Sequence, residues 1–582
     1  MKTFPKKIAS ALALAACAAA ALPGGRVRGD TPWSFGVMCD TQWTVSDDGK
    51  NPNTCAVDIA TQIQQQFITK GVKFVAEVGD LCDDGSTAGE DTRAAYAQSL
   101  YNAGIGFYAL PGNHDAASTA QAELQRIYPQ NQNGVMNAAV SYNGVSLNDI
   151  HMSVPVNTNG TFSCGTNFTS PSTALAGLSY SFTYNNATFV LLDKDGVSTI
   201  DAQQNWINST LSSRPAGTQA FVLGHEGIIT EYHADNLFAG DPSGDPAGTN
   251  AFINGLANND VHYYIGGHDH MFDYTQVTTT DGVSNHVDEI VCASDSSKFY
   301  TPNNPSNDYT YDYLKTGVYR QTPISQQLYD VGYYVYTIDG PRCTVQYYAA
   351  LNTGASGGAI STTPTLNFTL QQTYGYSLNG KEFLVAQGGS YTAVQDAIPA
   401  GNGFQGTSMK IIGTNSLNKG TLKDGSGRAE SKAVDTGWTP ITDPSVPTNM
   451  ASDVLTLWGL QDISATHTDT YTLSVKFDPS KATSDQINNG AVFIESQDAN
   501  GNWVNTVNLN TGGTPKFVLG AYSDSDGLGT YGVDLSDDTA WAVVNHDSTF
   551  GVANSAVAVP EPASLALLAL GGLALLSRRR KA

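Results

Sequence analysis

The stretch VKFVAEVGDLCD at residues 72–83 combines a strand-like, largely apolar run with a Gly-Asp pair at the point where the run ends. A short apolar run of this kind predicts a buried strand. Residues 53–69 before it and 91–103 after it carry apolar side chains at helical spacing. Further short apolar runs stand at 34–39 and 107–110. This alternation predicts a mostly parallel sheet, which binds ligands at the carboxyl ends of its strands.

The alternation of predicted strands and helices continues through the first 350 residues. Residues 180–193 predict a hairpin that turns at Asn185-Asn186, and residues 200–212 predict a helix. Two further strands are expected at 220–223 and 261–265. These elements define a first domain at 30–350, whose candidate functional residues are the polar side chains that directly follow the strands.

The pattern changes beyond a stretch rich in Gly, Ser and Thr at 354–364, so a linker is expected at 351–369. Residues 471–477 alternate apolar with polar side chains, and Asn500-Gly501 separates two strand-like runs. Helical periodicity is almost absent from 370 to 556. We therefore predict a separate β-sandwich-like accessory domain at 370–556.

Composition excludes several classes of protein. A chain of 582 residues is too long for one compact core, and 41% hydrophobic with 14% charged residues fits neither a coiled coil nor an acid-rich disordered chain. Acidic residues number 53 and basic residues 29, which gives a net charge of −24. Seven of the basic residues lie at the extreme ends. The acidic body repels phosphate backbones, so no nucleic-acid partner is expected from surface charge.

The N-terminal end predicts an export signal. Residues 1–22 carry three lysines and then an Ala- and Leu-rich apolar run, which is the form of a secretory signal peptide. The segment that ends at Cys17 also fits a bacterial lipoprotein box, so lipidation of Cys17 stays open. In an exported chain the six remaining cysteines allow 15 disulfide pairings, and their spacing separates none of them. They stand at Cys39, Cys55, Cys82, Cys164, Cys292 and Cys343.

The C-terminal end, residues 559–582, joins three features in order: Pro560-Glu561-Pro562, an apolar stretch at 565–576, and a basic cluster at 578–581. The apolar stretch is shorter than the ~20 residues that span a bilayer. The tail resembles the PEP-CTERM sorting signal of Gram-negative bacteria, which an exosortase recognises. This resemblance implies transient membrane anchoring, followed by delivery to the cell surface, the outer membrane or an extracellular matrix.

Clusters of polar residues follow the predicted strands of the first domain. They are Asp40-Thr41-Gln42, Gly79-Asp80-Leu81-Cys82-Asp83, Gly112-Asn113-His114-Asp115, Gly224-His225 and Gly267-His268-Asp269-His270. Each alone fits a turn or a helix cap. Together they bring carboxylate, amide and imidazole groups to one end of a sheet, where they offer ligands for two divalent metals.

The order of these clusters resembles the calcineurin-like metallophosphoesterases over residues 33–350. The resemblance implies an α/β (α+β) four-layer fold, a double β-sandwich flanked by helices, here followed by the all-β sandwich-like domain. By the same resemblance, the first metal is bound by Asp40, Asp80 and His270. The second metal is bound by Asp80, Asn113, His225 and His268, with Asp80 shared between the two.

Other roles follow from the same resemblance. His114 is the expected general acid or leaving-group stabiliser, Asp115 orients it, and Asp83 supports the loop from outside the ligand set. The family's first motif usually carries a histidine where this chain has Gln42, whose amide oxygen can still coordinate a metal. The remaining histidines, His233 among them, lack motif partners and are expected to be ordinary packed or surface residues.

The predicted function is that of an exported phosphoesterase that hydrolyses small phosphate esters with a hydroxide on two divalent metals. Manganese, iron, zinc and magnesium all stay open, because Gln42 makes the first site less zinc-like. The choice between monoester and diester substrates also stays open. The alternative is a catalytically impaired surface or matrix interaction protein that uses the fold as a scaffold. The β domain is expected to be either a spacer or a module that faces an extracellular matrix or a cell-surface polysaccharide.

Overall fold

The computed structural model describes residues 31–42, 54–137, 161–163, 165–196, 198–229, 231–233, 235–238, 245–296, 298–300, 320–351, 365–386, 394–396, 404–413, 431–460 and 468–554. The expected signal peptide, most of the expected linker and the sorting tail lie outside these residues. In the part of the chain that is described, no helix combines the length and the apolar character needed to cross a membrane.

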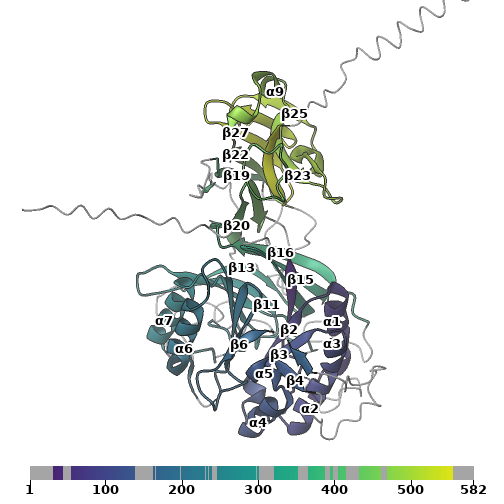
Figure 1. The fold of residues 1–582 in the computed structure, drawn as a ribbon, viewed down its shortest axis with the longest axis vertical. Coiled ribbons are helices and arrows are strands. Elements are labelled where there is room, and N and C mark those ends of the chain that lie inside the picture. The colour runs from purple at the N-terminus through teal and green to yellow at the C-terminus, as the bar shows by residue number, and fades with distance from the viewer. Residues whose placement is uncertain are drawn as a thin grey trace, which may run out of the picture.

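Two sheets stack face to face in the N-terminal unit (Figure 1). The first has the strand order β16-β15-β14-β1-β2-β3, in which β1, β2 and β3 run parallel and β14 to β16 are added antiparallel. Its strands are β1 (Trp33–Met38), β2 (Phe74–Val78), β3 (Gly106–Leu110), β14 (Asp330–Asp339), β15 (Arg342–Leu351) and β16 (Thr369–Ser377).

The second sheet has the order β13-β11-β12-β10-β9-β8-β7-β6, with a parallel centre formed by β8, β9, β10 and β12. The predicted hairpin at Asn185-Asn186 joins β7 to β8. The strands of this second sheet are β6 (Thr166–Thr169), β7 (Tyr180–Tyr184), β8 (Ala187–Leu192), β9 (Gln219–Gly224), β10 (Tyr263–Gly266), β11 (Phe272–Thr278), β12 (His286–Val291) and β13 (Gln321–Gln327). A small separate pair consists of β4 (Val135–Asn137) and β5 (Thr161–Ser163).

Helices cover the outer faces of both sheets (Figure 1). Those of the first sheet are α1 (Val57–Lys70), α2 (Thr87–Tyr96), α3 (Gln98–Asn102), α4 (Ser118–Ile127) and α5 (Gln130–Asn133), and those of the second are α6 (Ile200–Ser212) and α7 (Pro246–Ala257). Strand β2 is buried along its whole length because Phe74 faces the other sheet and Val75 faces the helices. The four layers of helix, sheet, sheet and helix confirm the predicted fold class.

The C-terminal unit consists of two further six-stranded sheets around a core of their own, which includes Trp438, Leu473 and Val552. One sheet contains β17 (Glu382–Ala386), β20 (Ser431–Thr439), β21 (Val454–Trp458), β23 (Val492–Gln497), β24 (Trp503–Asn505) and β28 (Thr549–Asn554). The other contains β18 (Val394–Asp396), β19 (Thr407–Gly413), β22 (Thr470–Lys476), β25 (Lys516–Leu519), β26 (Thr530–Asp534) and β27 (Thr539–Val544). The expected all-β region is therefore present, with α9 (Ser484–Asn488) as a short helix beside it.

Strand β16 departs from the domain boundaries expected from sequence. The division at residue 370 assigned this segment to the accessory domain, whereas β16 pairs with β15 in the first sheet. The reason is that Tyr374 and Tyr376 fill the aromatic core between the two stacked sheets. The helix expected at 91–103 also differs, because it begins at Thr87 and is divided into α2 and α3.

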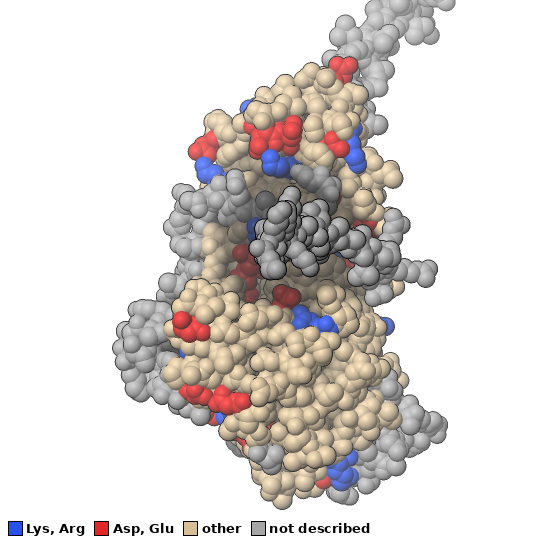
Figure 2. Space-filling view, turned by 60° about the vertical axis from the view of Figure 1, so that its left-hand side comes forward, with Lys and Arg blue, Asp and Glu red and all other residues tan. Residues whose placement is uncertain are grey.

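Charged side chains are sparse on the face drawn in Figure 2, and its lysines and arginines are scattered rather than gathered. The face therefore presents no basic patch among the described residues, which agrees with the acidic composition. The described cysteines are all buried and none of them is in a disulfide: Cys39, Cys55, Cys82, Cys292 and Cys343. Cys164 lies outside the described residues.

Candidate functional site

The carboxyl ends of parallel strands from both sheets meet at one place. Asp40 and Asp80 follow β1 and β2, and Asn113 begins a short turn after β3. From the second sheet, His225 directly follows β9 and His268 follows β10. Main-chain hydrogen bonds tie these ends together, among them one of 3.1 Å from the Asp40 amide to the carbonyl that precedes Asp80. The clusters were expected at one end of a single sheet; instead, the strand ends of two sheets bring these side chains together.

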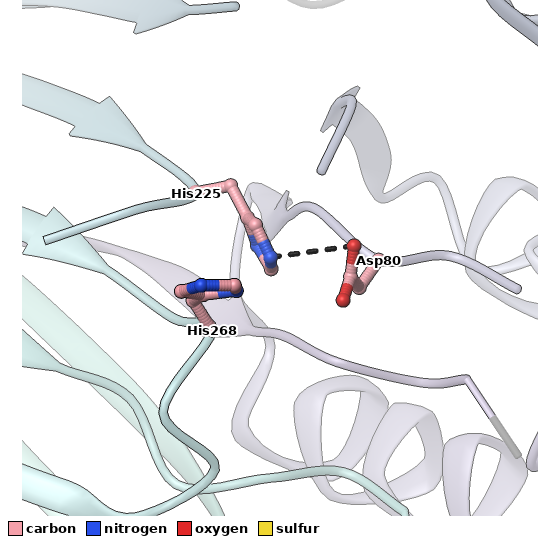
Figure 3. A group of neighbouring side chains, drawn as sticks. All are labelled: Asp80, His225 and His268. Atoms are coloured by element: carbon pink, nitrogen blue, oxygen red, sulfur yellow. Dashed lines mark ion pairs between the residues drawn. The ribbon is translucent and has the colours of Figure 1, made fainter. Parts of the chain in front are cut away.

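Asp80 lies at the centre of two overlapping groups of ligand atoms. One group is Asp80, His225 and His268, and the other is Asp40, Asp80 and His270; within each, the ligand atoms lie within 4.8 Å of one another. Figure 3 shows the first group, in which His225 Nε2 is 3.3 Å from Asp80 Oδ1. In the second group His270 Nε2 is 3.3 Å from Asp40 Oδ1. A carboxylate shared in this way is what a dinuclear metal site requires.

The two amide side chains lie at this cluster in different ways. Asn113 Oδ1 is 3.2 Å from His225 Nε2, so its oxygen faces the other ligand atoms. Gln42 instead directs its nitrogen inward, 2.7 Å from Asp80 Oδ2 and 3.3 Å from His270 Nε2. Its Oε1 atom is buried and has no hydrogen-bond partner within the described residues. As it lies, Gln42 donates a hydrogen bond to Asp80; coordination would require its amide to turn over.

Each histidine of the cluster has an acceptor on the ring nitrogen that points away from the cluster. The bonds are His225 Nδ1 to the Val78 carbonyl oxygen at 2.8 Å, His270 Nδ1 to the Lys298 carbonyl oxygen at 2.6 Å, and His268 Nε2 to Asp235 Oδ1 at 3.4 Å. A carbonyl oxygen only accepts, so the facing nitrogen carries the hydrogen. The opposite nitrogen then keeps its lone pair for a metal, which is the usual arrangement of metal-ligating histidine.

Burial and mutual charge set the ionisation of the cluster. Burial lowers the pKa of His268 and holds that of His270 well below its usual value, so both rings are neutral. Burial also raises the pKa of Asp40 to about 7, and the neighbouring Asp80 adds to this. Burial opposes ionisation of Asp80 as well, but the charge and hydrogen bond of His225 outweigh it and lower the pKa of Asp80. Burial likewise opposes protonation of His225, but the charge and hydrogen bond of Asp80 outweigh it and raise the pKa of His225 well above its usual value. Asp80 and His225 thus form a charged pair, and a bound cation would take the place of the His225 proton beside Asp80.

The backbone of the ligand residues is strained. Asp40, Asp80, His268 and His270 all have positive φ, at 53°, 50°, 71° and 52°. Non-glycine residues rarely adopt this left-handed conformation, and each such residue costs about 1–3 kcal/mol. Strain of this kind persists only where the surrounding structure enforces it and is concentrated at functional sites.

Two glycines allow the ligand loops to approach closely. A Cβ atom at Gly79, whose φ is +83°, would lie 2.5 Å from His225 Nδ1. At Gly112 a Cβ atom would lie 2.2 Å from Asp80 Oδ1. Neither distance is tolerated by real side chains, so glycine at both positions is a requirement of the ligand geometry.

His114 lies beside the cluster, but Asp115 does not orient it as expected. The His114 ring is held by a 2.5 Å hydrogen bond from Nδ1 to the Asp83 carbonyl oxygen, and its Nε2 atom lies 3.9 Å from Asp80 Oδ2. The Asp115 carboxylate instead accepts from the main-chain amides of Leu81 and Gly112, at 3.1 and 2.9 Å. Asp115 is buried beneath the loops, so it fixes their backbone while Asp83 holds the histidine.

Several residues at the site were not identified from sequence. His233 stacks on His268 with ring centroids 3.9 Å apart, and its Nδ1 atom is 2.8 Å from Asp269 Oδ1. Asp269 stands inside the Gly-His-Asp-His motif, which was a signal that could have revealed it. Asp235 and Lys298 come from connecting segments without periodicity, and the sequence carried no signal for them.

A family model for calcineurin-like phosphoesterases matches residues 46–272, the part of the chain that supplies most of these residues. This part of the chain is a calcineurin-like phosphoesterase domain. A second model, for the PEP-CTERM protein-sorting motif, matches residues 558–581. The sorting motif indicates export and sorting to the cell envelope. No curated protein matches the chain.

Solved structures similar to the chain are of low identity. The GAP50 anchor in the inner membrane complex of Plasmodium is 15% identical at a TM-score of 0.33, covering 58% of this chain and 90% of that one. Purple acid phosphatase PPD1 from yellow lupin is 14% identical at 0.33, covering 60% and 54%. A dimetal phosphatase from Danio rerio is 15% identical at 0.30, covering 54% and 95%.

The donor set of the phosphoesterase domain fits divalent metals. Aspartate oxygens, one amide oxygen and neutral imidazole nitrogens suit manganese, iron or zinc. The outer hydrogen bonds of the three histidines point the same way. Asp40, Asp80 and His270 would hold one ion, and Asp80, Asn113, His225 and His268 the other. These ligand assignments stay predictions.

Proposed function

We propose that the chain is an exported phosphoesterase that hydrolyses phosphate esters at two divalent metal ions held between its two sheets. The observation that carries this proposal is the overlap of two ligand groups at Asp80. When bound, the ions supply positive charge that offsets the charge developing on the attacking and leaving oxygens. The family match and the strained ligand backbone support the same conclusion.

His114 is proposed to serve the leaving group. Because Nδ1 is held by the Asp83 carbonyl, Nε2 is the atom that faces the cluster and can hold or transfer a proton. The main-chain amide of His114 also donates to Asp80 Oδ1 at 2.9 Å, which keeps the ring at a fixed place relative to the shared carboxylate. Asp115 contributes by fixing the two loops that carry Asp80 and His114.

The sorting motif supports the remaining parts of the proposal. Exosortase processing at the tail would follow export, and the phosphoesterase domain would then act at the cell surface or in an extracellular matrix. The two all-β sheets would form an accessory unit that faces this environment. The small substrates expected from the sequence suit a site that gathers its positive charge locally in an acidic protein.

The test is metal analysis of the purified protein, followed by assays with an aryl phosphomonoester and an aryl phosphodiester. Two ions per chain and hydrolysis of at least one ester are expected. Asp80→Ala should lose both ions and all activity, and Asn113→Ala should abolish activity by weakening the second site. Lys410→Met, a surface change in the C-terminal unit, is the control and should leave both readouts unchanged. Two bound ions without turnover of any ester would favour an interaction protein built on the fold.

A further inference from the structure

The main chain of Lys298 is fixed by the metal cluster. Its carbonyl oxygen accepts the 2.6 Å hydrogen bond from His270 Nδ1, and its amide donates to Ser296 Oγ at 3.1 Å. Ser296 in turn bonds Ser294, whose hydroxyl lies 3.2 Å from the same ring nitrogen of His270. These bonds fix the main chain of Lys298, from which its side chain extends, relative to the cluster.

The side chain of Lys298 extends from there toward His114. Its Nζ atom lies 3.5 Å from His114 Nε2 and 3.6 Å from Asp83 Oδ1. Charge-assisted hydrogen bonds are normally 2.7–2.9 Å long, so neither contact is a strong one. The side chain is 18% exposed, and its ammonium group also lies 5.8 Å from the centre of the Tyr300 ring.

Lys194, another described lysine at the site, is bound quite differently. Its Nζ atom lies 3.2 Å from Glu226, 3.3 Å from Asp195 and 3.8 Å from Asp235. Three carboxylates therefore surround this ammonium group and neutralise it. Of these two lysines, Lys298 is the one whose charge is available to an anion beside His114.

Phosphate monoesters and diesters differ in the charge and in the number of terminal oxygens that such a cation can bind. A monoester carries about −1.5 to −2 charge at pH 7 and three terminal oxygens. A diester carries a single charge and two terminal oxygens. Two metal ions supply charge for the reacting oxygens, so the additional oxygen and charge of a monoester require a further donor.

We propose that Lys298 binds a terminal phosphoryl oxygen of the substrate and thereby makes the site selective for phosphate monoesters over diesters. This inference rests on the proposed function and names its substrate class. In this proposal the ammonium group beside His114 contacts the third terminal oxygen of a bound monoester. A diester, whose corresponding oxygen is esterified, gains no comparable bond.

The test compares the unaltered protein with Lys298→Met and Lys298→Arg on an aryl monoester and an aryl diester with the same leaving group. For Lys298→Met we expect kcat/KM to fall on the order of 10- to 100-fold on the monoester and less than about threefold on the diester. Much of the loss should appear in KM. Lys298→Arg should recover most of it, because it keeps the charge. Metal content should stay at the unaltered level, and Lys410→Met should behave as the unaltered protein.

A binding measurement makes the test independent of turnover. Calorimetry with inorganic phosphate should give a dissociation constant at least about tenfold higher for Lys298→Met than for the unaltered protein. An equal loss on both esters, a preference of the unaltered protein for the diester, or unchanged phosphate binding overturns the proposal. Loss of metal from Lys298→Met also overturns it, since the residue would then act only through His270. If the metal-loaded protein hydrolyses neither ester, the proposed function fails, and phosphate binding alone decides the role of Lys298.

Discussion

Gln42 is the residue at which the site departs from its family pattern. Its amide nitrogen faces Asp80 and His270, while its oxygen is buried without a partner in the described structure. A neutral amide binds divalent metals less strongly than imidazole does. The first metal site should therefore be the weaker of the two.

Gln42→His should strengthen that site. An imidazole in this place adds a nitrogen ligand, so the variant should retain more metal after dialysis against a mild chelator and should shift its preference toward zinc. Metal content measured over a series of chelator concentrations gives the comparison. Gln42→Ala is the matched control and should retain less than the unaltered protein. Equal retention in all three proteins would show that residue 42 is not a ligand.

The sequence could predict that these candidate ligands gather, because each belongs to a compact motif that begins within a few residues of the end of a strand. It could not predict Lys298 or Asp235, since their positions depend on the paths of connecting segments. The sequence predicts that Asp115 orients His114, whereas its carboxylate accepts from the main-chain amides of Leu81 and Gly112. A motif records which residues are neighbours in sequence, whereas the bond from His114 goes to the carbonyl of Asp83 in another loop.

At the scale of elements, the turn after β2 determines the geometry of the shared ligand. Gly79 has a left-handed backbone, and its missing side chain makes room for the ring of His225. The turn thus couples a loop of the first sheet to a loop of the second. Its effect on the site should exceed its effect on the stability of the fold.

Gly79→Ala should lose most metal binding, because the added methyl group would push His225 away from Asp80. Gly71→Ala is a matched control: this glycine ends α1 with a φ of +67°, but nothing lies within 4 Å of an added Cβ atom. Both changes carry a similar backbone cost of about 1 kcal/mol. Only the first should lower metal content, as measured by elemental analysis. The interpretation fails if the two variants lose metal equally.

The strands that precede the site motifs could be predicted from apolar runs, as could the hairpin of β7 and β8. Strand β16 could not be assigned to its sheet, because alternating Tyr374 and Tyr376 fit any half-buried strand. Which sheet a strand joins depends on long-range packing, here against the aromatic core between the sheets.

At the scale of the whole molecule, a buried group of acids lies where the two units meet. Asp288 of β12 accepts from Tyr274 at 2.7 Å, and Gln276 of β11 donates to Glu382 of β17. Glu382 is paired in register with Asp435 of β20. Burial raises the pKa of Asp288 to about 7 and raises those of Glu382 and Asp435 well above their usual values.

Stability should therefore fall as the pH rises through this window. The folded state keeps the Asp288 proton up to about pH 7, whereas the unfolded chain releases it above about pH 4, so ionisation favours unfolding between these values. At about 1.4 kcal/mol per pKa unit, the loss is on the order of 2–4 kcal/mol. Asp288→Asn removes this contribution, so its melting temperature should rise relative to the unaltered protein between pH 4.5 and 7.5. A difference that is constant with pH would contradict the prediction.

Removal of the sorting tail should leave the catalytic activity unchanged. A chain that ends at residue 557 lacks the PEP-CTERM motif but keeps every described residue of the site. We expect its kcat/KM to equal that of the full chain, while cell fractionation should find it in a different compartment. Loss of activity on truncation would mean that the tail contributes to the site.

The candidate metal ligands are divided between the two stacked sheets: Asp40, Asp80 and Asn113 follow strands of one, and His225 and His268 follow strands of the other. Neither sheet alone carries a complete set for both ions. Under the proposed function, a molecule whose sheets have not closed on each other cannot be active, so hydrolysis itself reports that folding is complete. Under that same proposal, the exported enzyme stays inactive until it has finished folding. The cell that makes it then needs no inhibitor to protect its own phosphate esters.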